Sequence, residues 1–203
     1  VPDEVRGELS MDLQVAHAIA PGARKVVVNA LQTVGCDGGY RKIGEMLEET
    51  DRQFPGAVWS FSIGWGCDKL ITAADLAPVR AALRTAQSHG TTAYNASGDL
   101  AGMECRGGQD WSSPPSDQDI GLDSIASLPE MTSVGGTTLS TDADGRWVSE
   151  QTWFDVPLSQ GTGGGTSALF DMPAWQQVAA AGVTPERHNG KRMTPDVAAV
   201  ADP

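Results

Sequence analysis

The sequence predicts an α/β fold in which a mostly parallel sheet carries helices on both faces. Between residues 25 and 96, short β-branched runs alternate with stretches whose apolar residues recur every three or four positions. With 203 residues, of which 40% are hydrophobic and 20% are charged, the chain is long enough to bury a substantial core. One domain is the default expectation, and in such a sheet binding sites collect at the carboxyl ends of the strands.

The first predicted elements are a helix, a strand and a second helix. Residues Glu8–Ala20 have apolar side chains at helical spacing, and Pro21 and Gly22 then end the pattern. The three consecutive valines within Lys25–Leu31 predict a buried strand. Ile43, Leu47 and the stretch Glu45–Arg52 predict the helix that follows.

The next elements repeat this order. Ala57–Ile63 is expected to form a strand, and Asp75–His89 a helix that ends at Gly90. Thr91–Ala96 then reads as another strand. This succession is a βαβ pattern, which favours parallel strand pairing.

The second half of the chain has a different character. A loop rich in Ser, Pro, Asp and Gly covers Gly102–Asp119, and strands are expected at Met131–Leu139 and Arg146–Trp153. We interpret Asp142–Gly145 between these strands as a hairpin turn. The same residues could begin a calcium loop, but the further oxygen ligands of that loop are missing.

Charge and composition exclude several classes of function. Acidic residues outnumber basic ones by 26 to 14, giving a net charge of −12, and this argues against a nucleic-acid partner. No apolar run reaches 18 residues, so no membrane span is expected, and the first seven residues do not resemble a signal peptide. Cys36, Cys67 and Cys105 form no metal-binding pair. One disulfide with one thiol left over is compatible with secretion, as is a disulfide partner outside this chain, and spacing does not identify the partners.

Two segments contain candidate catalytic carboxyls. Glu8 and Asp12 are four residues apart, so a helix would place them on one face, where they could share a proton. Such pairs are also common on solvated helix faces. Ser97-Gly98-Asp99 follows a predicted strand, where an α/β sheet positions active groups, although the same three residues also form ordinary turns.

Four motifs in order resemble the signatures of the sedolisin family, the serine-carboxyl peptidases. They are Ser97-Gly98-Asp99; Ser133-Val134-Gly135-Gly136-Thr137; Gly163-Gly164-Gly165 with Ser167, Phe170, Pro173, Trp175 and Gln176; and Pro195-Asp196-Val197 with Ala201-Asp202-Pro203. The resemblance covers nearly the whole chain. It implies a subtilisin-like fold, incomplete here, with residues 1–203 as the central part of the catalytic domain.

The resemblance also implies roles for individual residues. Glu8 would be the general base toward a serine hydroxyl, Asp12 would orient Glu8, and protonated Asp99 would donate a hydrogen bond in the oxyanion hole. The substrate-binding residues would be Ser62, Ile63, Gly64 and Trp65 at one strand end and Ser97 and Gly98 at the next. The implied enzyme is secreted, works in acid and cleaves proteins or peptides, as an endopeptidase or a tripeptidyl-peptidase.

Several family features are expected outside this chain. The nucleophile belongs to a Gly-Thr-Ser motif followed by three residues and a Pro, downstream of Ala201-Asp202-Pro203. Ser167 follows Gly-Thr, but its next proline comes two positions too late for that motif. The resemblance further implies a calcium ion whose ligands lie outside this chain, an earlier part of the catalytic region, and a propeptide.

Two other readings remain open at this point. The chain could be a catalytically inactive sedolisin-like module that binds peptides, or a fragment completed by another chain. A conventional serine protease would require a catalytic histidine, and His17, His89 and His188 each sit where an ordinary structural role explains them.

Overall fold

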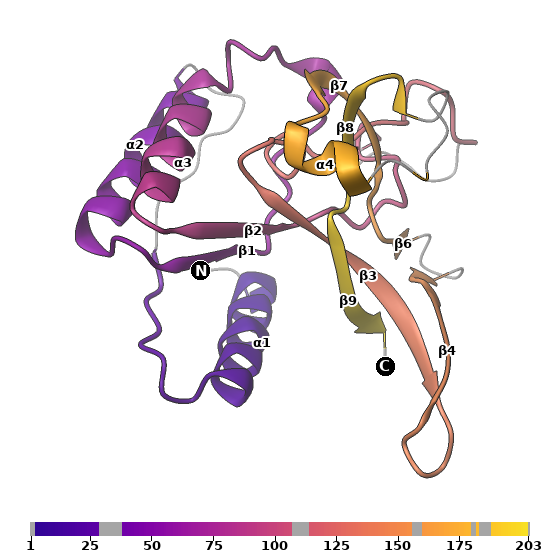
Figure 1. Cartoon of the computed structure of the whole chain (residues 1–203). Coiled ribbons are helices and arrows are strands. Elements are labelled where there is room, and N and C mark those ends of the chain that lie inside the picture. Colours follow the sequence, from indigo (N-terminus) through magenta and orange to yellow (C-terminus); the bar gives the residue numbers. More distant parts are fainter. Residues whose placement is uncertain are drawn as a thin grey trace. The chain divides into compact units, whose positions relative to one another are not determined.

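The computed structural model describes residues 3–28, 38–106, 114–155, 160–179, 182 and 188–202. The chain divides into two compact units, Val1–Leu31 and Gln32–Pro203. The first unit contains helix α1, and the second contains the sheet and the remaining helices (Figure 1).

Helix α1 spans Asp3–Ile19 and confirms the helix predicted over Glu8–Ala20, with an earlier start. The predicted strand at Lys25–Leu31 is wrong for its described part, because no strand includes residues 25–28. Val26, Val27 and Val28 are 42%, 50% and 47% exposed. A β-branched run becomes a strand only when a neighbouring strand pairs with its backbone, and the sheet pairings of the described residues do not include this run.

The central sheet of the second unit is mostly parallel, as predicted. Its strand order is β1-β2-β3-β4, and β9 pairs with β3 as well (Figure 1). Strands β1 to β3 run parallel to one another, β9 runs parallel to β3, and β4 is antiparallel. The bounds are β1 Val58–Phe61, β2 Thr92–Ala96, β3 Thr132–Thr141, β4 Trp147–Thr152 and β9 Val197–Asp202.

Helices α2, Gly39–Gln53, and α3, Ala77–Ser88, confirm the two predicted helices of this unit. They bury apolar side chains in one core with β1, β2 and the segment before β3; its members include Leu47, Trp59 and Leu83. Among the described residues, no helix combines the length and apolar character needed to cross a bilayer.

The predicted hairpin turn between β3 and β4 is confirmed. Gly145 has a φ of +77° and donates its N–H to the Asp142 carbonyl at 3.0 Å. The Asp142 carboxylate accepts the N–H groups of Asp144 and Arg146, both at 2.9 Å. These bonds build the turn itself, which favours it over a calcium loop.

The remaining elements are short and lie around the sheet. They are the 3-10 helix η1 (Asp68–Leu70), β5 (Phe154–Asp155), β6 (Gln160–Gly161), β7 (Gly165–Asp171), α4 (Ala174–Ala179) and β8 (Lys191–Thr194). Strands β5 and β6 form one antiparallel pair, and β7 and β8 form another.

Candidate active site

The two segments predicted to bind substrate, which begin at Ser62 and at Ser97, lie at the same edge of the sheet. Ser62 begins the segment that follows β1, and Ser97 begins the segment that follows β2. Strands β1 and β2 are parallel neighbours, with Phe61 opposite Asn95. Their carboxyl ends therefore meet, as expected for the site of an α/β sheet.

Asn95, at the end of β2, joins the two segments. It is 1% exposed, and its side chain accepts a hydrogen bond from the Trp65 indole N–H at 2.8 Å. Its amide nitrogen donates to the carbonyls of Ile63, at 3.2 Å, and Ala96, at 2.7 Å. The Trp65 side chain is itself 2% exposed, so it anchors this segment in the core, whereas Ile63 and Gly64 are exposed beside it.

Asp123, which is 58 residues further along the chain than Trp65, also holds the segment after β1. Its carboxylate accepts backbone N–H bonds from Trp65, from Ile125 at 3.1 Å and from Ala126 at 2.9 Å. Burial raises the pKa of Asp123 to about 6, although these backbone bonds oppose the rise. The buried carboxyl fixes the backbone of the predicted substrate edge.

Asp99 reaches the surface immediately after β2. The surrounding chain still desolvates its carboxyl, and this raises the pKa of Asp99 above its ordinary value. The preceding Gly98 has a φ of +113°, a conformation that residues with a Cβ rarely adopt. A glycine here therefore sets the direction in which the chain presents Asp99.

Glu104 lies directly behind this turn. Its Oε1 accepts the backbone N–H of Leu100 at 2.9 Å, and a Cβ on Gly98 would clash with its carboxyl group. Burial raises the pKa of Glu104 to about 7; the Leu100 bond opposes the rise, and the charges of Asp123 and Asp99 add to it. Glu104 is thus a second protonatable carboxyl at the Asp99 loop.

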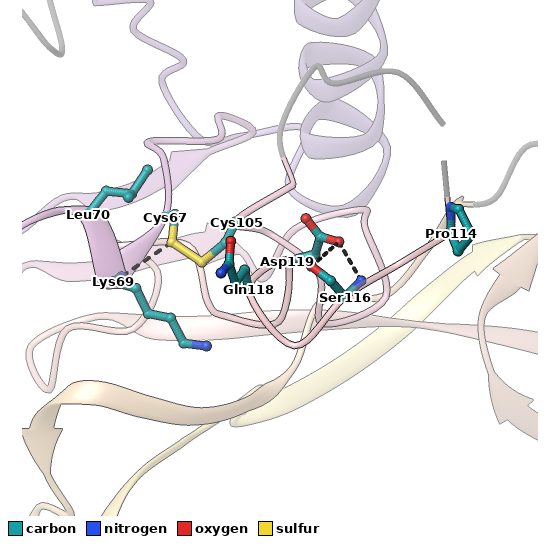
Figure 2. A pocket seen from close by; sticks show the side chains of 8 residues that line it. All are labelled: Cys67, Lys69, Leu70, Cys105, Pro114, Ser116, Gln118 and Asp119. Atoms are coloured by element: carbon teal, nitrogen blue, oxygen red, sulfur yellow. Dashed lines mark hydrogen bonds between the residues drawn. A yellow bond between two sulfur atoms is a disulfide. The ribbon is translucent and has the colours of Figure 1, made fainter. Parts of the chain in front are cut away.

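A disulfide joins Cys67 to Cys105 and ties the two site segments together. Cys67 follows Trp65 by two residues, and Cys105 is next to Glu104. Closing a loop of 38 residues stabilises the fold by about 4 kcal/mol on chain-entropy grounds. Figure 2 shows the disulfide in the wall of a cavity of about 360 Å³ that Lys69, Leu70, Pro114, Ser116, Gln118 and Asp119 also line. None of the predicted site residues lines this cavity.

Glu8 and Asp12 both lie on α1, one helical turn apart, so the helix that their spacing requires is present. Glu8 is exposed and Asp12 is partly buried. The two residues belong to the first unit and Asp99 to the second. The approach of Glu8 to Asp99 stays a prediction.

The chain is similar in sequence to two known proteins, although no protein-family model matches it. Kumamolisin from Bacillus sp. (strain MN-32) is 34% identical over 206 residues, which cover 100% of this chain and 34% of kumamolisin. Sedolisin from Pseudomonas sp. (strain 101) is 36% identical over 119 residues, covering 56% of this chain and 18% of sedolisin.

The solved structure of Pseudomonas sedolisin, a serine-carboxyl proteinase complexed with two molecules of pseudo-iodotyrostatin, matches with a TM-score of 0.63 and 26% identity. The match covers 78% of this chain and 42% of the sedolisin chain. The chain belongs to the sedolisin family. It spans about a third of the length of kumamolisin.

Three of the sedolisin-like motifs meet at one cavity of about 300 Å³. It is lined by Gly135, Gly136 and Thr137 of the second motif, by Gly163 to Gly165 of the third and by Pro195 of the fourth, with Thr152, Thr162, Thr194 and Ala198. The glycines leave no side chain in the way, so three distant segments approach closely. The motifs therefore build one region of this chain.

Ser167 has a structural role in this chain. It lies on β7 and is 3% exposed. Its hydroxyl oxygen accepts the backbone N–H groups of Leu169 at 3.1 Å and Phe170 at 3.2 Å. A buried hydroxyl with these partners does not present a nucleophile to a substrate, which agrees with the sequence argument against Ser167.

The family resemblance implies a calcium ion, which requires a group of oxygen ligands. In the part of the chain that the structure describes, the one group of three potential ligand side chains is Cys67, Asp68 and Cys105. The two sulfurs are joined in the disulfide, and calcium requires six to eight oxygen ligands. These residues do not fit a calcium site.

Protonation of Glu104 and Asp123 should make the folded protein more stable in acid. Both folded pKa values, about 7 and about 6, lie above the ordinary values of 4.5 and 3.8. The folded state therefore binds more protons between pH 4 and 7, and the free energy of unfolding falls as the pH rises through this window. Thermal unfolding of the complete protein should show a melting temperature that decreases from pH 4.5 to pH 7.

Glu104→Gln isolates the contribution of one group. The amide keeps an acceptor for Leu100 but does not titrate, so the pH dependence should weaken by about 2 kcal/mol, a value reduced for solvent screening. Glu48→Gln, at an exposed position of α2, is the matched control and should leave the slope unchanged. An equal slope in the wild type and in Glu104→Gln would contradict the assignment.

Sequence reasoning missed Asn95, Glu104 and Asp123. Glu104 falls in the predicted loop Gly102–Asp119, and nothing in the local pattern around Glu104 or Asp123 distinguishes a buried carboxyl from a solvated one. A usable signal was the position of Asn95 inside a predicted buried strand, where a polar side chain needs partners.

Proposed function

We propose that the complete protein is an acid-active serine-carboxyl peptidase that hydrolyses peptide bonds through an acyl-enzyme. The observation that carries this proposal is the placement of Asp99: it follows β2, the strand whose Asn95 side chain bonds the Ile63 carbonyl, and its pKa is raised by desolvation. A protonated carboxyl at this position can donate a hydrogen bond to a carbonyl oxygen of a bound peptide. Similarity to kumamolisin over the whole chain supports the same reaction class.

In the proposed reaction, Glu8 takes the proton of a serine hydroxyl as its oxygen attacks the scissile carbonyl. Asp12 hydrogen-bonds Glu8 and orients it, while Asp99 donates to the oxyanion. Protonated Glu8 then gives its proton to the leaving amine, and water releases the acyl group by the reverse sequence. We propose that the serine comes from a segment outside this sequence.

The proposed roles require opposite protonation states. Asp99 must be protonated to donate, whereas Glu8 must be ionised to accept a proton. Desolvation of Asp99 moves its pKa toward less acidic values and so widens the range in which both conditions hold. Activity should be highest in moderate acid and should fall toward neutral pH.

The proposed substrate is an extended peptide that lies along Ser62, Ile63 and Gly64 and reaches Ser97 and Gly98. Ile63 and Gly64 are exposed residues along which a peptide strand would pair, and alternate peptide side chains would then point into pockets. Because the Trp65 side chain is buried, we assign it the role of holding this edge in place.

We also propose a localisation, partners and a metal ion for the complete protein. The Cys67–Cys105 disulfide supports secretion, because disulfides persist in oxidising compartments. A propeptide or a complementary chain as partner, and a calcium ion with ligands outside this chain, follow from family membership.

Cleavage of a fluorogenic peptide library from pH 3 to pH 7 tests the proposal on the complete protein. We expect hydrolysis in acid that declines toward pH 7, a range that spans carboxyl titration. The variant Glu8→Gln, purified identically, controls for contaminating proteases. Peptide binding without cleavage at every pH would contradict the peptidase and support a peptide-binding module.

A further inference from the structure

The segment 161–163, which begins with the last residue of β6 and ends before β7, lies against the backbone of the Asp99 loop. Gly163 donates its N–H to the Gly98 carbonyl at 2.7 Å, and Gly161 donates to the Asp99 carbonyl at 2.8 Å. Ala101 returns a bond to the Gly161 carbonyl at 3.0 Å. Three backbone hydrogen bonds therefore hold the residues immediately around Asp99.

The Thr162 hydroxyl connects this segment to two others. It accepts the backbone N–H of Gly136, on β3, at 2.8 Å. It also lies 3.3 Å from the Ser97 hydroxyl, and Ser97 is 4% exposed. One oxygen thus links the centre of β3, the end of β2 and the segment that holds Asp99.

The close approach depends on glycine. A Cβ at position 163 would clash with the Ser97 carbonyl oxygen, and a Cβ at position 161 would lie 2.8 Å from Phe154 Cδ2. A further backbone hydrogen bond fixes segment 161–163 to the residue before β5, because Thr162 donates its N–H to the Trp153 carbonyl at 3.1 Å. The segment that bonds the Asp99 loop is therefore itself bonded to a second part of the chain.

We infer that Thr162 is a positioning residue for Asp99: its hydroxyl fixes segment 161–163 to β3, and that segment holds the Asp99 backbone. This inference rests on the proposed role of Asp99 in the oxyanion hole. A hydrogen-bond donor stabilises the oxyanion only at the correct place, and an error of 1 Å costs about a hundredfold in rate. Loss of the hydroxyl leaves the Gly136 N–H without its partner and lets the segment shift.

The test compares Thr162→Val, which has the same shape without the hydroxyl, with Thr162→Ser, which keeps the hydroxyl, in the complete protein. We expect Thr162→Val to lower kcat about tenfold with KM little changed, since the damage is at the oxyanion. Thr162→Ser should stay close to the wild type. Thr141→Val, at an exposed position on β3, is the matched control and should have no effect.

A double-mutant cycle separates positioning of Asp99 from general structural support. In an Asp99→Ala background, Thr162→Val should cause no further loss, because its effect passes through the Asp99 carboxyl. An equal loss in both backgrounds, or no loss in the wild-type background, overturns the inference. Full activity of Asp99→Ala alone would instead overturn the proposed function.

Thr162→Ala provides a second variant if Thr162→Val does not fold. It removes the same hydroxyl without adding an apolar branch beside Gly136. The expected result is a decrease in kcat that also disappears in the Asp99→Ala background. A decrease of the same size in both backgrounds would contradict the inference.

Discussion

Replacing Glu8 by Gln in the complete protein is expected to lower kcat/KM for peptide hydrolysis by about 10³-fold. The amide cannot accept the serine proton, and a positioned general base contributes about 10²- to 10⁴-fold. Shape and helix propensity are nearly conserved, because Glu and Gln are both good helix formers. The measurement is steady-state hydrolysis of a fluorogenic peptide at the acid optimum.

Two further variants make this result specific. Asp12→Asn keeps Glu8 but weakens its orientation, so its loss should be smaller than that of Glu8→Gln. Glu48→Gln makes the same change of charge on α2, where the side chain is exposed, and should retain wild-type activity. Undiminished activity in Glu8→Gln would remove Glu8 from the role of general base.

Replacing Asp99 by Ala is expected to lower kcat by about 10²- to 10³-fold in acid, where Asp99 is protonated, the usual cost of one lost oxyanion donor. The loss relative to the wild type should shrink toward pH 7, where an ionised Asp99 no longer donates. Asp99→Asn should behave differently, because an amide N–H₂ donates whatever the pH. We expect this variant to retain more activity than Asp99→Ala and to lose less of it as the pH rises toward 7. The measurement is kcat against pH for the three proteins.

The comparison tests whether protonation of Asp99 sets the proposed acid optimum. If loss of the Asp99 proton limits activity near neutral pH, the Asp99→Asn variant, which has no such proton to lose, must keep its kcat to a higher pH than the wild type. An identical alkaline limb in the wild type and in Asp99→Asn would show that another group sets it. Circular dichroism of each variant checks that the loop substitution has left the fold intact.

The sequence was informative where structure is local. Helical periodicity predicted α1, α2 and α3, and Gly145 identified the turn between β3 and β4. The strand prediction at Val26 to Val28 failed for the opposite reason. Strand formation depends on a partner elsewhere in the chain, and β-branched residues only record a preference for such a partner.

The sequence by itself also identified candidate carboxyls. Asp99 follows a strand, and Glu8 and Asp12 share a helical spacing, so their placement needed only the type and order of elements, whereas their catalytic roles come from the family resemblance. Whether Glu8 approaches Asp99 depends on the arrangement of the two units and stays a prediction.

Tertiary structure alone decided what holds Asp99 and the substrate edge. The contact between Ser97 and Thr162 spans 65 residues, and the bond between Asp123 and Trp65 spans 58. The pairing of Cys67 with Cys105 belongs to the same group. Such contacts follow from strand order and register, which bring distant segments together, and a pattern that repeats every two or four residues contains no information about them.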